Sequence, residues 1–372
     1  MTATYGVLKE ISRRGHRITV LTTVIGQPKT PAIMTLDNGA LTVRYLQGFF
    51  EGVFFSPRLI RLLPSLQGHD LVHLNSYRNF PCDAVHIWAR RQEIPTIISA
   101  HGTISAYRYQ PSFPLSRQLI YRLHDIVLPG PVRSADVAIA VSSLEARHYE
   151  AFGVSPKRIR VVPNCVDLDT FSPGRPEHPL EESSGSKLVG YVGRLDPIKG
   201  LVTLLNAFEL VHRQDPQSKL VMIGPDFGMK KVLHSIIAER NIPGVVFRNP
   251  VPYRQLVDIY RSLDVAVSPS SFEVFGMSNL EAMACGRPVV STNIGGASDL
   301  IEEGYDGYLV QPGDHEALAS QILNLLQDEE RAKTIGKNAW SKAQAYGIER
   351  TANLLEQTYA DCLSTNTTHR TT

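Results

Sequence analysis

Two glutamates lie eight residues apart in the part of the sequence with the clearest chemical potential. The stretch runs Glu273-Val-Phe-Gly-Met-Ser-Asn-Leu-Glu281. An apolar run that ends at Pro269 precedes it and predicts a buried strand, and helix-forming residues follow it from Ser278 to Cys285. One glutamate would therefore lie in the loop after a strand and the other about one turn into the next helix, so that both border one pocket.

This loop suits a ligand that has both phosphates and hydroxyl groups. In an open parallel sheet, ligands bind outside the carboxyl ends of the strands, where such loops lie. Gly276 lets a ligand approach the backbone closely, and the helix start offers N–H groups and a positive dipole end to an anion. Because carboxylates cannot hold an anion, Glu273 and Glu281 would instead accept hydrogen bonds from hydroxyl groups.

The glutamate pair and its flanks resemble the signature of the retaining nucleotide-sugar glycosyltransferases of group 1 (family 4). Phe275-Gly276 lies between the glutamates, and Glu-Ala-Met-Ala-Cys-Gly-Arg-Pro-Val-Val follows from Glu281. Two acids at this spacing also occur by chance on many solvated helices, so the flanks carry the resemblance. It implies an α/β protein of GT-B architecture, with two doubly wound Rossmann-like domains that face each other across a cleft.

The resemblance implies that Arg194 and Lys199, in the loop that opens with Gly193, hold the diphosphate of the donor. Fixed cations stabilise the charge that grows on the leaving group as the sugar–phosphate bond breaks. Without this context, the same loop is a strand-to-helix turn with two solvated cations. We find no Asp-x-Asp of the kind that holds a divalent ion in other glycosyltransferases, and therefore expect metal independence and no cofactor.

The resemblance assigns the remaining donor contacts to the glutamate loop. Glu281 is implied to accept hydrogen bonds from the ribose, and Glu273 from hydroxyls of the transferred sugar. Three backbone N–H groups would complete the phosphate site, those of Phe275, Gly276 and Met277.

In the first domain, Ser-Ala-His101-Gly resembles the active-site histidine motif of the family. The resemblance implies that the imidazole lies near the reacting sugar. A lone histidine is otherwise more often structural. Basic residues lie where the family binds acceptors, and they would either meet a lipid phosphate or be solvated: Arg108, Arg117, Arg122 and Arg133. A phenylalanine-rich segment with two arginines, from Phe49 to Leu63, is either a membrane-facing amphipathic segment or a core helix with a loop.

Composition is that of an ordinary globular protein. The 372 residues predict two domains, and a net charge of +2 gives no case for nucleic acid. The four cysteines are scattered without metal-ligand spacing, and no apolar run reaches transmembrane length. We expect a cytoplasmic protein, at most attached to the inner face of the membrane.

The order of predicted elements sets the domain boundaries. Residues 1–170 alternate strands and helices and would form the acceptor-side domain. Residues 171–187, rich in proline and serine, predict a linker, and residues 188–345 predict the nucleotide-sugar domain. A terminal helix over 346–363 would cross back to the first domain, followed by a polar tail over 364–372.

The start of the chain departs from the family pattern, because a helix over residues 4–14 comes first and no strand precedes it. A central strand would then be missing, with unpaired edges on its neighbours and an exposed apolar face around Ile11. We therefore expect a strand and a glycine-containing loop, about 15–25 residues, to be encoded upstream. Alternatively, the chain is complete and either re-pairs its sheet or has lost activity.

These observations predict transfer of a hexose from a nucleotide-diphosphate sugar to a saccharide or lipid-linked acceptor, with retention of configuration. Such an enzyme would serve polysaccharide or glycolipid biosynthesis. Two alternatives stay open: a non-catalytic or truncated homologue, and a nucleotide-sugar epimerase or hydrolase on the same fold.

Overall fold

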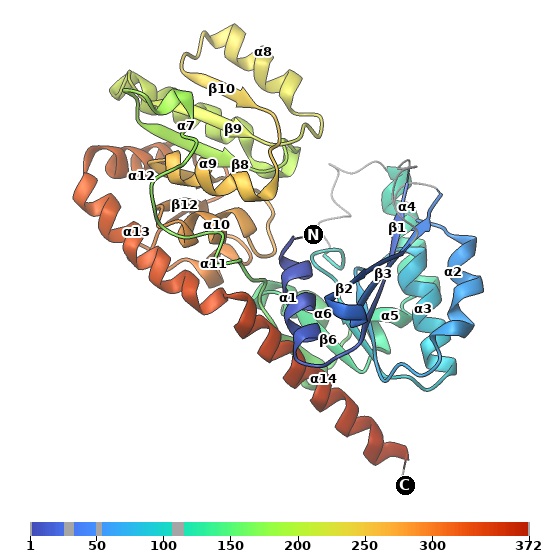
Figure 1. Ribbon diagram of the computed structural model, residues 1–372. Coiled ribbons are helices and arrows are strands. Elements are labelled where there is room, and N and C mark those ends of the chain that lie inside the picture. Colours follow the sequence, from blue (N-terminus) through green and yellow to red (C-terminus); the bar gives the residue numbers. More distant parts are fainter. Residues whose placement is uncertain (1, 26–32, 50–53, 106–114, 371–372) are drawn as a thin grey trace. The chain divides into compact units, whose positions relative to one another are not determined.

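The chain folds into two compact units, shown in Figure 1. The computed structural model describes residues 2–25, 33–49, 54–105 and 115–370. Unit 1 comprises Ala3–Pro163 together with Glu349–Thr372, and unit 2 comprises Asn164–Ile348. The boundary therefore lies at Pro163, earlier than the predicted residue 170.

Unit 2 is built on a six-stranded parallel sheet in the order β10-β9-β8-β11-β12-β13. From β8 the chain adds β9 and β10 on one side, and then returns to add β11, β12 and β13 on the other. The topological switch point, where such sheets bind ligands, therefore lies between β8 and β11. The strands are β8 (Leu188–Val192), β9 (Lys219–Ile223), β10 (Val245–Arg248), β11 (Val265–Ser268), β12 (Val289–Thr292) and β13 (Tyr308–Val310).

Helices cover this sheet and bury its apolar strands in one core, to which α7 contributes Leu204, Leu205 and Phe208. The helices are α7 (Leu201–Gln214), α8 (Lys230–Arg240), α9 (Leu256–Ser262), α10 (Met277–Ala284), α11 (Ala297–Leu300), α12 (His315–Gln327) and α13 (Glu329–Ala343). The predicted linker over 171–187 is part of this unit. Phe171 is fully buried, and the Glu177 N–H donates to Asp258 Oδ1 at 2.8 Å, because the segment packs along α9.

The strands of unit 1 form two sheets. The order is β1-β3-β2 in one and β4-β5-β6-β7 in the other. Only β2 runs antiparallel to its neighbour, and no strand of the described chain lies between β1 and β4. The strands are β1 (Ile18–Val24), β2 (Ile33–Leu36), β3 (Leu41–Gln47), β4 (Val72–Asn75), β5 (Thr96–Ser99), β6 (Val137–Ala140) and β7 (Ile159–Val161).

The first helix of unit 1 buries Val7 and Ile11, whereas Leu8 is half-buried. Val7 and Ile11 are 5% and 2% exposed. The helices of this unit are α1 (Thr2–Arg13), α2 (Pro57–Leu62), α3 (Phe80–Arg91), α4 (Leu115–Val127), α5 (Gly130–Arg133) and α6 (Ser143–Ala151). Within the described residues, no helix of either unit combines the length and apolar character needed to cross a bilayer.

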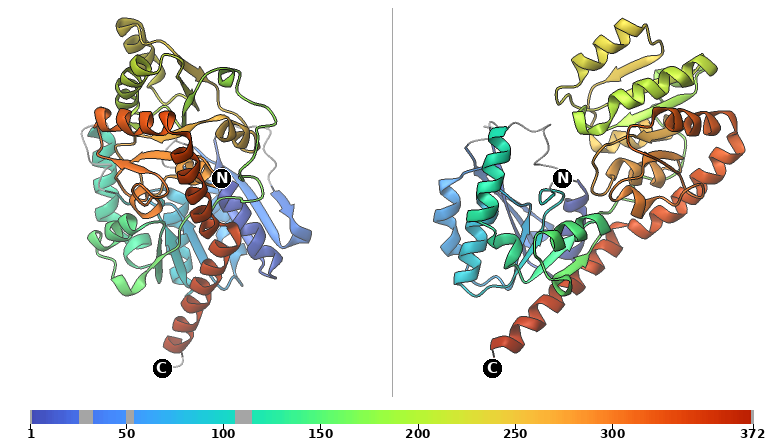
Figure 2. Two further views of the ribbon diagram at one scale, coloured as in Figure 1. Left: turned by 90° about the vertical axis from the view of Figure 1, so that its left-hand side faces the viewer. Right: turned by 180° about the vertical axis from the view of Figure 1, so that it is seen from behind.

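The long helix α14 (Ile348–Arg370) completes unit 1, as both views of Figure 2 show. Leu354, Leu355 and Tyr359 pack against the core around Ile97 of β5. The helix continues to Arg370, whereas the sequence predicted a polar tail from Ser364. Hydroxyl groups of Ser364 and Thr365 bond the backbone of the preceding turn, so this polar stretch remains helical.

In unit 2, α13 crosses the end of α10 through a glycine. A Cβ on Gly336 would lie 2.3 Å from Gly286 O. We expect Gly336→Ala to lower the free energy of unfolding by about 1–3 kcal/mol because of this clash, although helix propensity alone would raise it. Urea unfolding followed at Trp340, in a Trp88→Phe background, measures the effect within unit 2.

The matched control is Ser341→Ala, which removes an exposed side chain from the same helix. It should be neutral or slightly stabilising. A stabilising Gly336→Ala would show that the two backbones do not approach as described.

Candidate active site

The loops that follow β8 and β11 are joined backbone to backbone at the switch point. A Cβ on Gly200, which has φ 65°, would lie only 1.9 Å from Pro269 O. The Ser271 backbone N–H and hydroxyl both donate to Ile198 O, at 2.8 and 3.0 Å. Glycine is needed at position 200 for its conformation and for this close approach. The two loops that carry the predicted donor residues therefore form one surface.

Lys199 and Glu273 meet across these loops. Lys199 Nζ donates to Glu273 Oε2 at 2.7 Å, and the two side chains are 17% and 18% exposed. The sequence assigned the lysine to phosphate and the glutamate to sugar hydroxyls, and the structure places them in contact. Because an ammonium group has three donors, Lys199 can keep this bond and still donate to an anion.

Arg194 lies beyond this pair and is more open to solvent. Its side chain is 47% exposed, and its guanidinium lies 5.0 Å above the ring of Phe227 and 3.5 Å from Asp196 Oδ2. The Tyr191 hydroxyl donates to the Arg194 backbone carbonyl at 2.6 Å and fixes the turn after Gly193. The backbone is thus held while the cationic end stays available.

The start of α10 is built as the sequence predicted. Gly276 has φ 93°, and its carbonyl accepts the N–H groups of Asn279 and Leu280. The N–H groups of Met277 and the next residue precede these first intrahelical bonds, where a helix can offer donors to an anion. Gly296, after β12, packs against Phe275, and a Cβ there would lie 2.3 Å from Phe275 Cα.

Glu281 lies under this helix start and is 7% exposed. Burial raises the pKa of its carboxyl group to about 7, while a hydrogen bond from the Tyr260 hydroxyl to Oε2, at 2.8 Å, opposes the rise. The carboxylate is thus an acceptor held in a dry site, as recognition of hydroxyl groups requires. Sequence reasoning missed Tyr260, because the pattern of α9 had not been identified as a helix.

In unit 1, His101 follows β5 in a strained turn. Its φ is 47° and that of Gly102 is 81°, and the His101 side chain is exposed. The fully buried Glu145 holds this turn, accepting from the N–H groups of Gly102 and Val141. Burial raises the pKa of the Glu145 carboxyl group, and both N–H bonds oppose the rise. Ser142-x-x-Glu145 signals a helix capping box, but here the carboxylate reaches the neighbouring turns instead.

His73, at the base of this turn, is held between two hydroxyl groups. Nδ1 lies 2.8 Å from the Tyr359 hydroxyl and Nε2 lies 2.7 Å from Ser99 Oγ. Burial, together with the nearby His101, lowers the pKa of His73 to about 4. The ring is therefore neutral at pH 7, and it links β4 to β5 and to α14 through these two hydroxyl groups.

The structure describes the predicted acceptor arginines only in part. Arg108 lies outside the described residues, the backbone of Arg117 belongs to α4, and Arg122 is exposed on α4. None of the four cysteines forms a disulfide, and all four are buried. In the described parts of the chain, no three His, Cys, Asp or Glu side chains form a group that could hold a metal ion.

The raised pKa of Glu281 predicts a stability that falls as pH rises. The unfolded carboxyl group ionises near its ordinary pKa of 4.5, but the folded one ionises near 7, so charging it in the buried site costs up to about 3 kcal/mol. We expect Glu281→Gln to be more stable than the parent at pH 8 and to lose this advantage near pH 4.5. Urea unfolding followed at Trp340 measures the difference.

Tyr260→Phe is the comparison variant, because it removes the bond that opposes the rise. It should steepen the loss of stability between pH 4.5 and 8. Parallel pH profiles for the parent and Glu281→Gln would contradict the buried-carboxylate interpretation.

Family comparisons agree with this architecture. Residues 177–342 match the family model described as glycosyl transferases group 1, and residues 2–170 match the model of glycosyltransferase family 4. A D-inositol 3-phosphate glycosyltransferase of Corynebacterium glutamicum (strain R) is 31% identical, over 95% of this chain and 90% of that protein. Relatives of the same name from Segniliparus rotundus and Corynebacterium aurimucosum are 33% and 32% identical over 62% and 63% of this chain. These two alignments cover 54% and 58% of the relatives, so they span little more than half of their length.

Solved structures show the same fold. Sucrose-phosphate synthase from Thermosynechococcus elongatus has a TM-score of 0.76 at 24% identity, covering 96% of this chain and 92% of that one. Anabaena HepE, solved in complex with UDP and glucose, has a TM-score of 0.74 at 21% identity, covering 96% and 95%. The chain belongs to the group 1 glycosyltransferases and has their GT-B fold of two Rossmann-like units.

Proposed function

We propose that the protein transfers a hexose from a nucleotide-diphosphate sugar to a saccharide or lipid-linked acceptor, with retention of anomeric configuration. One observation carries this proposal. The Lys199–Glu273 pair lies at the switch point of the unit 2 sheet, in the loops that also lead to the start of α10. A cation, a carboxylate and helix N–H groups in one place suit a ligand with phosphates next to hydroxyls.

In this proposal the diphosphate binds to the cations and to the helix start. Arg194 and Lys199 would pair with phosphate oxygens, and the N–H groups at the start of α10 would donate to the same group. Charge on the leaving phosphate increases in the transition state, so these fixed donors stabilise that state more than the ground state. No metal ion is required for this step, and metal independence is part of the proposal.

Hydroxyl groups of the donor would be bound by the carboxylates. The buried Glu281 would accept from the ribose, and Glu273 from the transferred sugar. His101 would contact the sugar near the reacting carbon. Retention would follow from attack on the face that the phosphate leaves, with the leaving phosphate taking the acceptor's proton.

The relatives support this class of reaction. The curated proteins are named for D-inositol 3-phosphate, and one structure of similar fold holds UDP and glucose. We therefore add a phosphorylated polyol to the saccharides and lipid-linked sugars that should be tested as acceptors. A cytoplasmic location, with access to soluble nucleotide sugars, fits the proposed donor.

The proposal predicts that one of a panel of UDP, GDP and ADP sugars releases its nucleotide and that the acceptor gains the mass of one hexose, as mass spectrometry would show. The acceptor panel includes D-inositol 3-phosphate, and NMR of the product gives the anomeric configuration. Lys199→Ala and Arg194→Ala should each weaken donor binding about tenfold or more, because each removes a charge-assisted contact. Arg213→Ala, which removes an exposed cation elsewhere in unit 2, is the control.

Unchanged donor affinity in both variants would contradict the phosphate assignment. Activity that is abolished by EDTA and restored by magnesium would contradict metal independence. Nucleotide release without any glycosylated product would favour a hydrolase, and an inverted product would overturn retention.

The two carboxylates should fail in different ways. Glu281→Gln should weaken free nucleotide and nucleotide sugar alike, because its predicted partner is the ribose. Glu273→Gln should leave free nucleotide affinity within about twofold and lower turnover, because its predicted partner is the transferred sugar. Calorimetric titration with nucleotide and with nucleotide sugar distinguishes them, and equal loss of free nucleotide in both variants would refute this division.

A further inference from the structure

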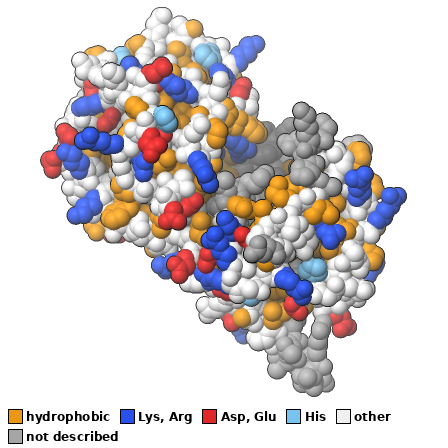
Figure 3. All heavy atoms as spheres, viewed as in Figure 1, with side chains coloured by type: hydrophobic (Ala, Val, Ile, Leu, Met, Phe, Trp, Pro, Cys, Tyr) orange, Lys and Arg blue, Asp and Glu red, His pale blue; other side chains and the backbone are white. Residues whose placement is uncertain are grey.

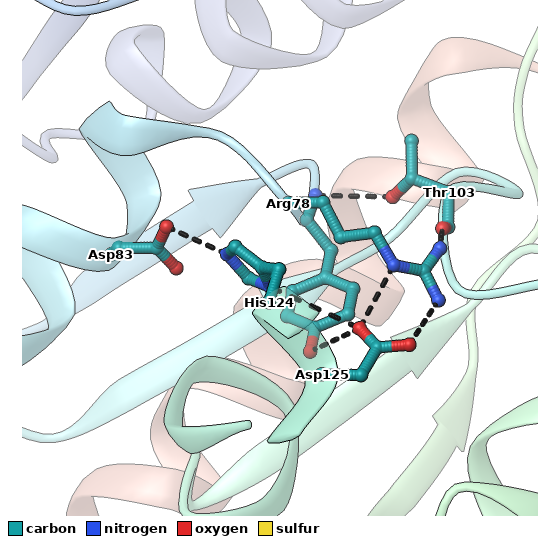
Figure 4. A network of polar contacts seen from close by, with 6 residues as sticks. Arg78, Asp83, Thr103, His124 and Asp125 are labelled. Carbon is teal, nitrogen blue, oxygen red and sulfur yellow. Dashed lines mark hydrogen bonds and ion pairs between the residues drawn. The ribbon is translucent and has the colours of Figure 1, made fainter. Parts of the chain in front are cut away.

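Two polar residues of helix α4, His124 and Asp125, contact residues of α3 and of the segment after β4, as Figure 4 shows. Asp125 accepts two bonds from Arg78, at 2.9 and 2.7 Å, and one from the Tyr77 hydroxyl at 3.0 Å. His124 Nε2 lies 2.9 Å from Asp83 Oδ2 on α3. Burial lowers the pKa of His124, but hydrogen bonds to Asp125 and Asp83 outweigh this and raise it to about 9, so the ring is cationic at pH 7.

The opposite side of α4 is apolar and exposed. Six aliphatic side chains are between 57% and 84% exposed: Leu115, Leu119, Ile120, Leu123, Ile126 and Val127. At 100° per residue they occupy an arc of about 140° on the helix surface. A surface helix of a globular protein normally has the reverse arrangement, with its apolar stripe toward the core.

The polar contacts fix this orientation. The Arg78 side chain is 2% exposed and that of Asp125 is 15% exposed. Rotating α4 to bury its leucines would break this pair and leave Arg78 as a buried charge without its carboxylate, which is strongly unfavourable. The outward-facing apolar arc is therefore a stable feature of unit 1. An exposed apolar surface of this kind indicates a site where another apolar surface binds.

The helices near α4 carry exposed basic residues. In Figures 1 and 2, α2 and α3 lie beside α4, and α2 packs on α3 through Leu59 and Leu63. Five arginines of these three helices are exposed: Arg58, Arg61, Arg90, Arg91 and Arg122. Both acids of the three helices face inward, Asp83 toward His124 and Asp125 toward Arg78. Figure 3 shows basic side chains along the edge of unit 1 where α2 lies.

We propose that this face docks on a bilayer surface that carries anionic headgroups. The apolar arc of α4 enters the boundary between headgroups and acyl chains, and the arginines pair with lipid phosphates. A 13-residue helix is about 20 Å long, too short to span the hydrocarbon core, so it lies in the plane of the interface.

Charge and shape favour lipid over a second copy of the chain. In a symmetric dimer through this face, the arginines of both copies would approach one another. Anionic headgroups supply the opposite charge, and acyl chains cover an aliphatic arc that lacks aromatic anchors. The sequence left Phe49–Leu63 open between a membrane-facing segment and a core helix with a loop, and residues 50–53 of it lie outside the described chain. Leu59 and Leu63 are buried, at 0% and 8% exposed, so the helix in this segment is a core helix, and the proposed lipid contact is on α4.

Flotation of the full chain with vesicles tests the proposal. The vesicles are phosphatidylcholine alone, or phosphatidylcholine with about a third phosphatidylglycerol. The protein should float with the anionic vesicles at low salt and be partly released as salt rises. Leu119→Ser/Leu123→Ser/Ile126→Ser should lower the partition coefficient about tenfold or more. This variant should keep its melting temperature, because the three side chains are exposed.

Matched variants separate apolar insertion from charge. Val161→Ser/Val232→Ser/Tyr305→Ser removes three exposed apolar side chains elsewhere and should float like the parent. Replacing Arg58, Arg61, Arg90 and Arg91 with Gln should weaken binding to anionic vesicles, whereas replacing the exposed Arg213, Lys231, Lys333 and Lys337 should not.

Two results of the flotation assay would overturn the proposal. One is a parent protein that does not float with anionic vesicles at low salt, and the other is an α4 variant that floats as well as the parent. A concentration-dependent dimer in light scattering, lost in the α4 variant and without vesicle binding, would identify a second copy as the occupant instead.

Discussion

The candidate donor site depends on one steric constraint, the contact of two loop backbones at Gly200 and Pro269. The loop after β8 comes from the start of unit 2 and the loop after β11 from its middle. A side chain at position 200 would hold them apart, since a Cβ would lie 1.9 Å from the Pro269 carbonyl oxygen. With glycine there, Lys199 reaches Glu273 across 74 residues of sequence at 2.7 Å. The Lys199–Glu273 contact therefore depends on position 200 being a glycine, which has no side chain.

Local patterns in the sequence were enough to predict the parts of this site, but not their contacts. The apolar strand β11, the left-handed Gly276 and the helix formers of α10 follow one another along the chain, so short-range rules identify them. The fold of unit 2 was predictable for the same reason. The Lys199–Glu273 pair depends on which strands are neighbours in the sheet, and periodicity contains no information about strand order. Tyr260 under Glu281 was missed for a different reason, because α9, which carries it, had not been identified as a helix.

Unit 1 was less predictable because its elements depend more on distant polar groups. The Ser142-x-x-Glu145 pattern signals a helix start. The Glu145 carboxylate, however, accepts a hydrogen bond from the N–H of Gly102 in the His101 turn, 43 residues earlier in the sequence. The short antiparallel strand β2 has an ordinary sequence and owes its direction to pairing with β3. The strands of unit 1 form two sheets because β1 and β4 do not pair with each other among the described residues.

Helix α4 shows how far such polar contacts can override the hydrophobic pattern. Its apolar residues recur at the spacing of a helix face, which predicts a helix, and a helix is found. The same pattern predicts that the apolar side faces the core, and this inference fails because Arg78 and Asp125 form a buried ion pair on the polar side. Leaving Arg78 buried without its carboxylate would cost more free energy than leaving the aliphatic side chains of α4 exposed to water. The ion pair therefore decides the orientation of the helix. Buried polar groups therefore position Glu281, the His101 turn and α4 alike, and they account for the features of this protein that hydrophobic periodicity does not.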